Sequence, residues 1–300
     1  MPKIAAVVVI YNPELSVVAN INSYIEQVGK LFVVDNSDKV INENLFQELH
    51  ALKNAEYISN KGNLGIAAAL NIGATRAIEE GFEYLLTMDQ DSEATPSMVL
   101  TLMECFSQDS KIGIVSPILY HPEGRNFIHK SEKSFERIIT AWTSGNLLDL
   151  DVFKKCGGFK EDLFIDYVDH EFCLRLNRMG FKVYVCNKAR LKHSLGNIEE
   201  VNLIFRKVYP TNHSALRLYY RTRNRFYVKK KYKSDLPEFF KQDNKDFWRT
   251  FLKIVLFEKA RIKKMKFMLK GYCDFRKNIF GRYEGPLRVI LIFFFLLSYG

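Results

Sequence analysis

The distribution of apolar residues predicts strands and helices in alternation over the first two hundred residues. Residues 4–10 form an unbroken, largely β-branched run, which is typical of a strand buried on both faces of a parallel sheet. The same pattern predicts strands at residues 31–34, 56–58, 84–88, 112–115, 141–148 and 181–186, and helices at residues 14–28, 66–80 and 96–106 and from about Asp169 onward. Strands alternating with helices imply right-handed βαβ units. We therefore expect an α/β fold with a mostly parallel sheet flanked by helices; residues 121–139 are polar and fit neither pattern.

Polar side chains follow the first four predicted strands at the point where each strand ends. They are Asn12, Asp35, Asn60 with Asn63, and Asp89 with Asp91. The carboxyl ends of parallel strands share one edge of a sheet, and ligands of open α/β folds bind there. Asp35 can accept a hydrogen bond from a base or a ribose, although the same residue type also caps helices. Four such ends in line indicate a nucleotide cleft.

Asp89 and Asp91 stand one residue apart directly after a predicted strand. Carboxylate oxygens suit Mg²⁺ or Mn²⁺, which commonly keep substrate phosphates among their ligands. Aspartate is also common in turns, so the pair alone does not distinguish a metal site from an acidic turn. Gly62 and Gly65 allow a tight loop before a helix, whose N-terminus favours an anion. Neither a G-x-G-x-x-G pattern nor a P-loop is present, which disfavours hydride transfer and NTP hydrolysis.

A second group of acidic residues marks the start of the helix predicted near Asp169. Asp166, Asp169 and Glu171 lie within six residues. The helix dipole favours acidic side chains in a first turn, which accounts for one carboxylate but not for three. A separate candidate is Gly145, which lies in the strand predicted at residues 141–148 and would permit the close approach of a ligand.

Charge divides the chain into two parts. The net charge is +10, yet residues 217–288 alone hold 22 lysines and arginines against 7 acidic residues. Such asymmetry points to a membrane or nucleic-acid surface, and we expect domains at residues 1–205 and 206–300. The five cysteines are widely spaced without a C-x-x-C pair, which argues against a disulfide framework or a zinc site.

The second part combines aromatic and basic residues. Residues 247–269 have the composition of an amphipathic helix that lies in a membrane interface. Residues 289–297 are apolar throughout, but a spanning helix needs ~20 apolar residues, so this run should dip into one leaflet or pack on protein. The N-terminus lacks a signal-peptide pattern. We expect a cytoplasmic protein bound peripherally to the inner face of the membrane.

Four motifs together resemble those of family 2 glycosyltransferases. They are V-V-V-I-Y-N-P, V-V-D-N-S-D, N-K-G-N-L-G-I-A-A-A-L-N-I-G and L-L-T-M-D-Q-D-S, in that order. The likeness is greatest to bacterial rhamnosyltransferases that build surface polysaccharide such as O-antigen or capsule. It implies the GT-A nucleotide-sugar fold and an inverting transfer. By the same resemblance the donor would be dTDP-L-rhamnose, the cofactor Mg²⁺ or Mn²⁺, and the acceptor a lipid-linked oligosaccharide at an anionic membrane.

The resemblance also implies roles for single residues. Asp169 matches the family's catalytic base, with Asp166 as the alternative because Val168 stands where the family often has an acid. Asp91 and Asp89 would hold the metal, together with His193. The residues that would contact the donor are Asn12, Asp35, Asn63, Asn71, Asp89, Gly145 and Asn146.

Other functions account for parts of the chain. A glycosyltransferase acting on another nucleotide sugar would carry the same motifs. A sugar-1-phosphate nucleotidyltransferase would need a Gly- and Arg/Lys-rich signature near the N-terminus, which residues 11–14 lack. A non-catalytic protein that binds membranes through its basic part would leave the acidic strand ends unexplained, and so would a nucleic-acid-binding protein, which we do not expect.

Overall fold

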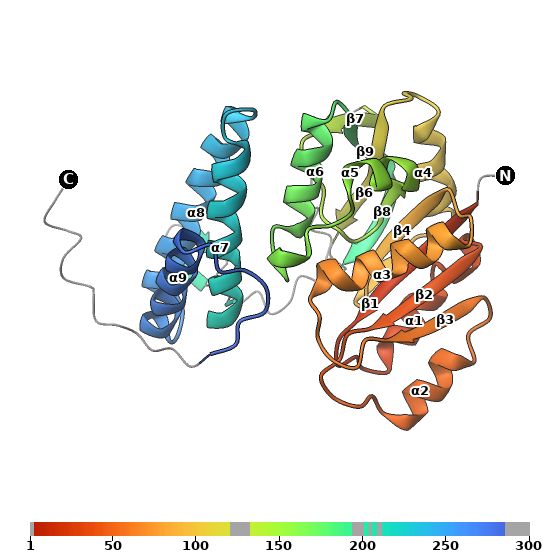
Figure 1. Ribbon diagram of the computed structural model, residues 1–300, viewed down its shortest axis with the longest axis horizontal. Coiled ribbons are helices and arrows are strands. Elements are labelled where there is room, and N and C mark those ends of the chain that lie inside the picture. The colour runs from red at the N-terminus through yellow and green to blue at the C-terminus, as the bar shows by residue number, and fades with distance from the viewer. Residues whose placement is uncertain (1–2, 121–132, 194–200, 204–205, 209–211, 286–300) are drawn as a thin grey trace, which may run out of the picture. The chain divides into compact units, whose positions relative to one another are not determined.

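The computed structural model describes residues 3–120, 133–193, 201–203, 206–208 and 212–285. The chain divides into two compact units, Met1–Gly196 and Asn197–Gly300 (Figure 1). The strands of the first unit are β1 (Ile4–Ile10), β2 (Lys30–Asp35), β3 (Ala55–Ser59), β4 (Tyr84–Asp89), β5 (Ser92–Ala94), β6 (Ile112–Tyr120), β7 (Phe135–Ile138), β8 (Asn146–Asp149) and β9 (Lys182–His193). Its α-helices are α1 (Ser16–Asn22), α2 (Glu43–His50), α3 (Ile66–Glu79), α4 (Met98–Phe106), α5 (Leu150–Cys156) and α6 (Val168–Arg178).

One sheet forms the centre of the first unit, in the strand order β3-β2-β1-β4-β8-β6-β9-β5 with β7 also paired to β9. The strands β3, β2, β1 and β4 run parallel (Figure 1). As its apolar run predicted, β1 is buried along nearly its whole length. The register places Val9 beside Asp89 and Ile10 beside Asp35. The prediction that the polar strand ends share one edge is therefore confirmed for these strands.

The other half of the sheet is mixed. β8 runs antiparallel to both β4 and β6, β6 runs parallel to β9, and β5 and β7 run antiparallel to β9. A fully buried strand has the same apolar pattern in either direction, so the sequence could not show these reversals. The strand predicted at residues 141–148 is wrong over its first half, since β8 begins only at Asn146, after Gly145 with a φ of +83°.

Several helices differ from the sequence prediction. Residues 14–28 hold the short α1 and a separate 3-10 turn (Ile25–Gln27) instead of one helix. The pattern missed α2 and α5, although both begin at a polar cap. The side chain of Asn42 accepts from the N–H of Asn44 before α2, and Asp149 accepts from the N–H of Val152 before α5. The caps mark where these short helices begin, while seven or eight residues hold too few turns for a clear apolar repeat.

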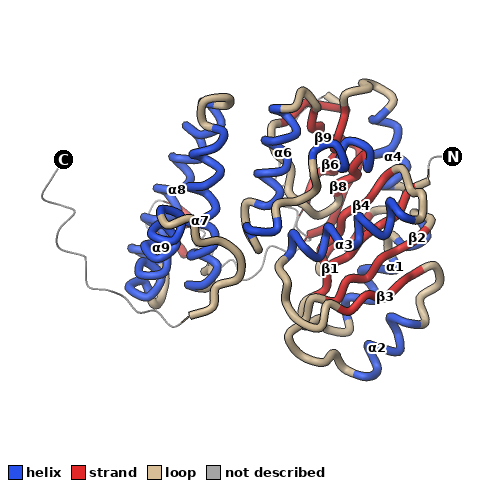
Figure 2. Tube along the Cα trace, viewed as in Figure 1, coloured by secondary structure: helices blue, strands red, loops and turns tan. Residues whose placement is uncertain are grey.

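The second unit is mainly helical, with α7 (Ala215–Tyr232), α8 (Pro237–Phe257), α9 (Arg261–Arg276) and a short hairpin of β10 (Val201–Leu203) and β11 (Arg206–Val208) (Figure 2). Gly271 lets α9 approach α7, because a Cβ there would lie 2.4 Å from the carbonyl oxygen of Tyr219. The single helix predicted over residues 247–269 is wrong. The chain turns between α8 and α9, where Glu258 is extended and Ala260 has a φ of +53°.

No helix among the described residues is long and apolar enough to cross a bilayer. The apolar run at residues 289–297 lies outside the described residues. Most of residues 121–139, for which the sequence predicted neither a strand nor a helix, also lies outside them.

Candidate active site

Asp89, Asp91 and His193 come together at the carboxyl edge of the sheet. Asp89 ends β4, and His193 ends β9, where it pairs with Ser92 of β5. One ligand atom from each of the three residues lies within 4.8 Å of the other two. Ligands of an octahedral Mg²⁺ at ~2.1 Å stand up to ~4.2 Å apart. Two carboxylates and an imidazole therefore need only a small adjustment to hold such an ion, and they leave coordination positions for phosphate oxygens.

Two buried serines connect the members of this cluster. The Ser92 hydroxyl lies 2.8 Å from Nδ1 of His193, which is also 3.5 Å from Oδ1 of Asp91. Ser144 donates to Ser92 at 2.8 Å and accepts from the backbone N–H of Asp89 at 3.1 Å. Groups that orient a ligand side chain influence metal affinity. Neither serine was predicted from the sequence, although Ser92 ends the motif L-L-T-M-D-Q-D-S and Ser144 directly precedes Gly145.

A pocket of about 410 Å³ opens beside the cluster. Its lining residues are Asn12, Glu14, Ser16, Val17, Asn20, Gln90, Asp91, Glu93 and Lys192. Gln90 joins its two sides: the N–H of Tyr11 donates to Oε1 of Gln90 at 2.7 Å, and Asn20 donates to the carbonyl oxygen of Gln90 at 2.8 Å. The segments that follow β1 and β4 are thus held together at the pocket that contains Asp91.

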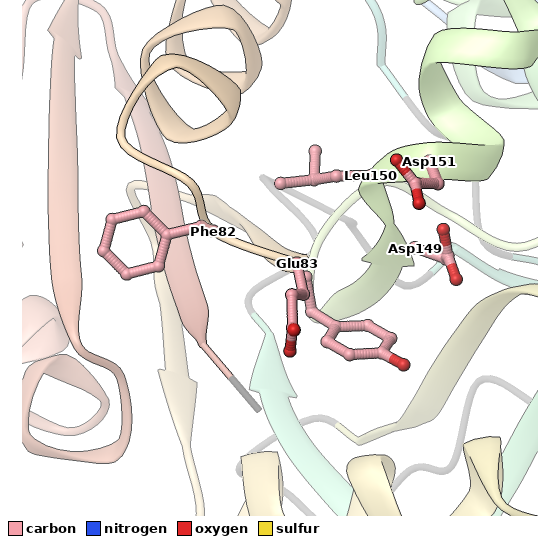
Figure 3. Close-up of a pocket in the computed structure, with 6 residues that line it drawn as sticks. Phe82, Glu83, Asp149, Leu150 and Asp151 are labelled. Carbon is pink, nitrogen blue, oxygen red and sulfur yellow. The ribbon is translucent and has the colours of Figure 1, made fainter. Parts of the chain in front are cut away.

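Another pocket, of about 330 Å³, lies at the opposite end of β4 (Figure 3). The six residues of β4 place its two ends about 17 Å apart. The lining of this pocket includes the carboxylates of Glu83, Asp149 and Asp151 and no basic side chain. Among the described residues only Asp151 has a cation beside it, Lys154 at 2.8 Å, and the remaining carboxylates repel a diphosphate. The pocket beside Asp91 contains Lys192, so we assign the substrate to the carboxyl end of the sheet.

Asp35 ends β2 at the same edge and is buried. Its Oδ1 accepts from the N–H of Ser37 at 2.9 Å, and its Oδ2 accepts from the hydroxyl of Tyr57 at 2.5 Å. Burial and the Asp35 carboxylate raise the pKa of Tyr57, which keeps this hydroxyl a donor. Asp35 and Asp89 lie two strands apart, about 10 Å at the usual spacing. That separation suits the nucleoside and the diphosphate of a single nucleotide.

The loop before α3 is closed by protein hydrogen bonds. The N–H groups of Leu64, Gly65 and Ile66 donate to side-chain or backbone oxygens at 2.9, 2.9 and 2.8 Å. Gly65 has a φ of +91°, and a Cβ there would lie 2.7 Å from the carbonyl oxygen of Phe164. The expectation that this helix N-terminus receives an anion is therefore wrong for these amides. Gly65 instead makes room for the segment that leads to α6.

Two residues predicted to contact the donor have protein contacts that explain them differently. Both amide protons of Asn71 are engaged, with the carbonyl oxygen of Phe159 at 2.9 Å and Oε1 of Glu161 at 2.8 Å. A Cβ on Gly145 would lie 2.7 Å from Pro117 and 2.8 Å from Leu191. Close packing thus accounts for Gly145. Asn71 holds the segment of Phe159 and Glu161 against α3.

The remaining predicted donor contacts lie along the carboxyl edge. The backbone N–H of Asn12 donates to the Ser37 hydroxyl at 2.8 Å, and Oδ1 of Asn63 accepts from the amide of Asn36 at 3.1 Å. Asn146 begins β8 opposite Thr87 of β4. Its Oδ1 is buried and has no hydrogen-bond partner among the described residues. Such an oxygen is costly unless a donor group reaches it, which favours a ligand hydroxyl or a water at this position.

Asp169 lies in the first turn of α6, partly buried, with Oδ1 2.7 Å from the N–H of His170 and 2.8 Å from its Nδ1. Burial acts to raise the pKa of Asp169, but the charge of His170 and its hydrogen bonds outweigh burial, so the pKa lies below its ordinary value. The carboxylate is therefore ionised at neutral pH, which a proton acceptor requires.

The segment before Asp169 adopts a costly backbone. Phe164, Asp166 and Tyr167 have φ values of +65°, +61° and +63°. Non-glycine residues in this region are strained, and such residues cluster at functional sites. The carbonyl oxygen of Phe164 is fixed by the N–H of Ile66. The strain therefore lies in the loop that holds Asp166 and ends directly before α6, whose first turn holds Asp169.

Glu171 has a different role from its acidic neighbours. It is fully buried and accepts from Arg175 at 2.7 Å, while Arg175 also donates to the carbonyl oxygen of Gly158 at 2.7 Å. A buried carboxylate paired in this way anchors α6 to the segment after α5. It accounts for the third acid of the cluster without assigning it a catalytic role.

The family model described as glycosyl transferase family 2 matches residues 5–168. The chain is also similar to dTDP-rhamnosyl transferase RfbF of Shigella flexneri. The two are 33% identical over 252 residues, which cover 76% of this chain and 80% of RfbF.

Two solved structures resemble the fold. TarS of S. aureus aligns with a TM-score of 0.59 at 14% identity, over 92% of this chain and 49% of TarS. GalNAc-T7, solved with UDP, GalNAc and Mn²⁺, aligns with a TM-score of 0.55 at 16% identity, over 64% of this chain and 43% of its own. The chain thus spans less than half the length of either solved protein. At these identities the likeness concerns the fold alone, and it confirms the predicted GT-A architecture.

Proposed function

The chain belongs to glycosyl transferase family 2 and is a glycosyltransferase, and on that basis we propose that it transfers L-rhamnose from dTDP-L-rhamnose with inversion. The acceptor would be a hydroxyl of a lipid-linked oligosaccharide in the synthesis of a surface polysaccharide such as O-antigen or capsule. The similarity to a dTDP-rhamnosyl transferase supports the donor. The enzyme would work at the cytoplasmic face of the membrane, where such an acceptor is presented.

The observation that carries this proposal is the cluster of Asp89, Asp91 and His193 at the edge of the sheet that also holds Asp35. Its donor set fits Mg²⁺ or Mn²⁺. Bound there, such an ion would neutralise the charge that develops on the diphosphate leaving group. Asp35 would then contact the nucleoside, and Ser92 with Ser144 would keep the His193 ring in position.

We assign the general base to Asp169, with Asp166 as the alternative three residues earlier. Inversion requires the acceptor oxygen to attack the anomeric carbon from the side opposite the diphosphate. Asp169 would take the proton of that hydroxyl as the new glycosidic bond forms and the bond to the diphosphate breaks. Its ionised state and its place after a strained loop support this role.

Replacing His170 by alanine is expected to raise the pKa of Asp169. A histidine ordinarily carries its proton at the acidic pH at which a carboxylate titrates, so the wild-type ring favours the ionised carboxylate there. Protonation of Asp169 stops proton transfer, so the acidic limb of kcat/KM should move to higher pH in the variant. A pH profile of rhamnosyl transfer measures this shift. If the acidic limb of kcat/KM stays at the same pH in the variant, the titration of Asp169 does not cause that limb.

A panel of nucleotide sugars tests the proposed donor. In the presence of Mn²⁺, titration calorimetry should give the tightest binding for dTDP-L-rhamnose and weaker binding for UDP- and GDP-sugars. A UDP- or GDP-sugar that binds more tightly would show a glycosyltransferase with another donor. The absence of binding by any nucleotide sugar would oppose the site assignment as a whole.

A further inference from the structure

Large apolar side chains are exposed along one line of α8. Trp248, Leu252 and Leu256 are 60%, 55% and 62% exposed. They are spaced four residues apart and therefore lie above one another on one face of the helix. Ile262, at the start of α9, is 64% exposed. We call Trp248, Leu252 and Leu256 the apolar line; exposed apolar groups of this size mark interaction surfaces.

The apolar line is a second apolar face of α8, separate from the face that packs in the core of the unit. Ile254 is fully buried and forms a cluster with Leu218 of α7 and Met268 of α9. Phe247 and Phe251 pack against the same cluster. The core of the second unit is thus formed by other residues of α8, and folding alone does not require the apolar line to be apolar.

The charge around the apolar line is predominantly positive, with one exposed acid at its start, Asp246, which is paired with Arg249 at 3.3 Å. Residues 247–273 hold eight lysines and arginines and a single acid, Glu258. Glu258 is buried and paired with Lys264 at 2.6 Å. The exposed charges of this stretch are therefore all positive; among them are Arg249, Lys259, Arg261, Lys263 and Lys266. Apolar side chains surrounded by cations match a surface with anionic headgroups above a hydrocarbon layer.

We propose that the apolar line docks on an anionic phospholipid bilayer. Trp248, Leu252 and Leu256 would enter the boundary between headgroups and acyl chains, and the basic side chains would meet lipid phosphates. Docked in this way, the second unit would lie on the bilayer surface. This inference deepens the proposed function, since it names the surface that would bring the enzyme to a lipid-linked acceptor.

Tryptophan fluorescence tests the docking directly. The chain has two tryptophans, Trp142 and Trp248, so a Trp142→Phe variant reports on Trp248 alone. Vesicles of phosphatidylglycerol and phosphatidylcholine should shift its emission to shorter wavelength, and acyl chains brominated near the headgroup should quench it. Pure phosphatidylcholine should have a much smaller effect. Unchanged emission with anionic vesicles at low salt would overturn the proposal, and an equal shift with neutral vesicles would remove its electrostatic part.

A pair of matched variants separates docking from catalysis. Leu252→Ser with Leu256→Ser should reduce sedimentation with anionic vesicles by at least ~10-fold, because each buried leucine contributes substantially to transfer from water. Leu100→Ser is the control: Leu100 is 64% exposed on α4 of the other unit and should leave sedimentation unchanged. Both variants should bind dTDP-L-rhamnose like the wild type, so failure of docking and failure of the proposed function give different results. If the wild type is a dimer and the double variant is a monomer that still binds vesicles, the apolar line belongs to self-association instead.

Discussion

Replacing Asp91 by asparagine is expected to weaken metal-dependent binding of dTDP-L-rhamnose by at least ~10²-fold. A unit charge at ~4 Å from an ion near a protein surface contributes several kcal/mol, and the amide lacks that charge. The side chain of Asp91 is 49% exposed, so the fold should be unaffected. Titration calorimetry with Mn²⁺ measures the binding, and thermal unfolding checks the fold.

Asp151→Asn is the matched control for this change. Asp151 is an aspartate whose side chain is 75% exposed, and it lines the pocket at the opposite end of β4 (Figure 3). Its loss should leave donor binding at the wild-type value. If Asp91→Asn binds the donor as the wild type does, or if Asp151→Asn weakens binding instead, the metal site has been placed at the wrong end of the strand.

Asp169→Asn should lower the rate of rhamnosyl transfer by at least ~10²-fold, because a positioned general base typically contributes ~10²–10⁴-fold. Asparagine keeps an oxygen for the N–H of His170 but cannot accept a proton. Donor affinity should stay within a few-fold of the wild type, since the donor contacts are assigned to other residues. Single-turnover transfer measured at saturating donor separates the two effects.

Asp166→Asn, in the loop before α6, provides the comparison. Asp166 lies three residues earlier with a φ of +61°, and asparagine tolerates that conformation as well as aspartate does. We expect this variant to retain most of its transfer activity. The reverse outcome, with Asp169→Asn active and Asp166→Asn inactive, would move the base to Asp166.

The strands at the candidate site could be predicted because their signal is local. The apolar run of β1 and the polar residues that end β2 and β4 are visible in sequence, and the parallel register that joins them follows from the βαβ connections. His193 lies about a hundred residues from Asp91, and only the resemblance to a family brought the two together. The hydroxyls of Ser92 and Ser144 are hydrogen-bonded to each other although the two residues lie far apart in the sequence. No local sequence pattern predicts such a contact.

Glycines and amides near the site were harder to interpret. Gly65, Gly145 and Asn71 have residue types that suit a ligand, yet protein groups occupy the space or the hydrogen bonds that a ligand would use. A glycine in a sequence shows that another group can come close to the backbone. It does not show whether that group is a ligand or another part of the protein. The break between α8 and α9 was missed for a similar reason. The apolar spacing continues through it, and the buried pair of Glu258 and Lys264 forms only in three dimensions.

The affinity of the wild-type protein for dTDP-L-rhamnose, measured by titration calorimetry with Mn²⁺ and again after removal of divalent ions with EDTA, tests the central claim most directly. If Asp89, Asp91 and His193 hold an ion on the diphosphate, EDTA should weaken binding by at least ~10²-fold, since the ion offsets repulsion between the diphosphate and the carboxylates. Added Mn²⁺ or Mg²⁺ should restore it. Equal affinity in both conditions would contradict the metal-dependent site.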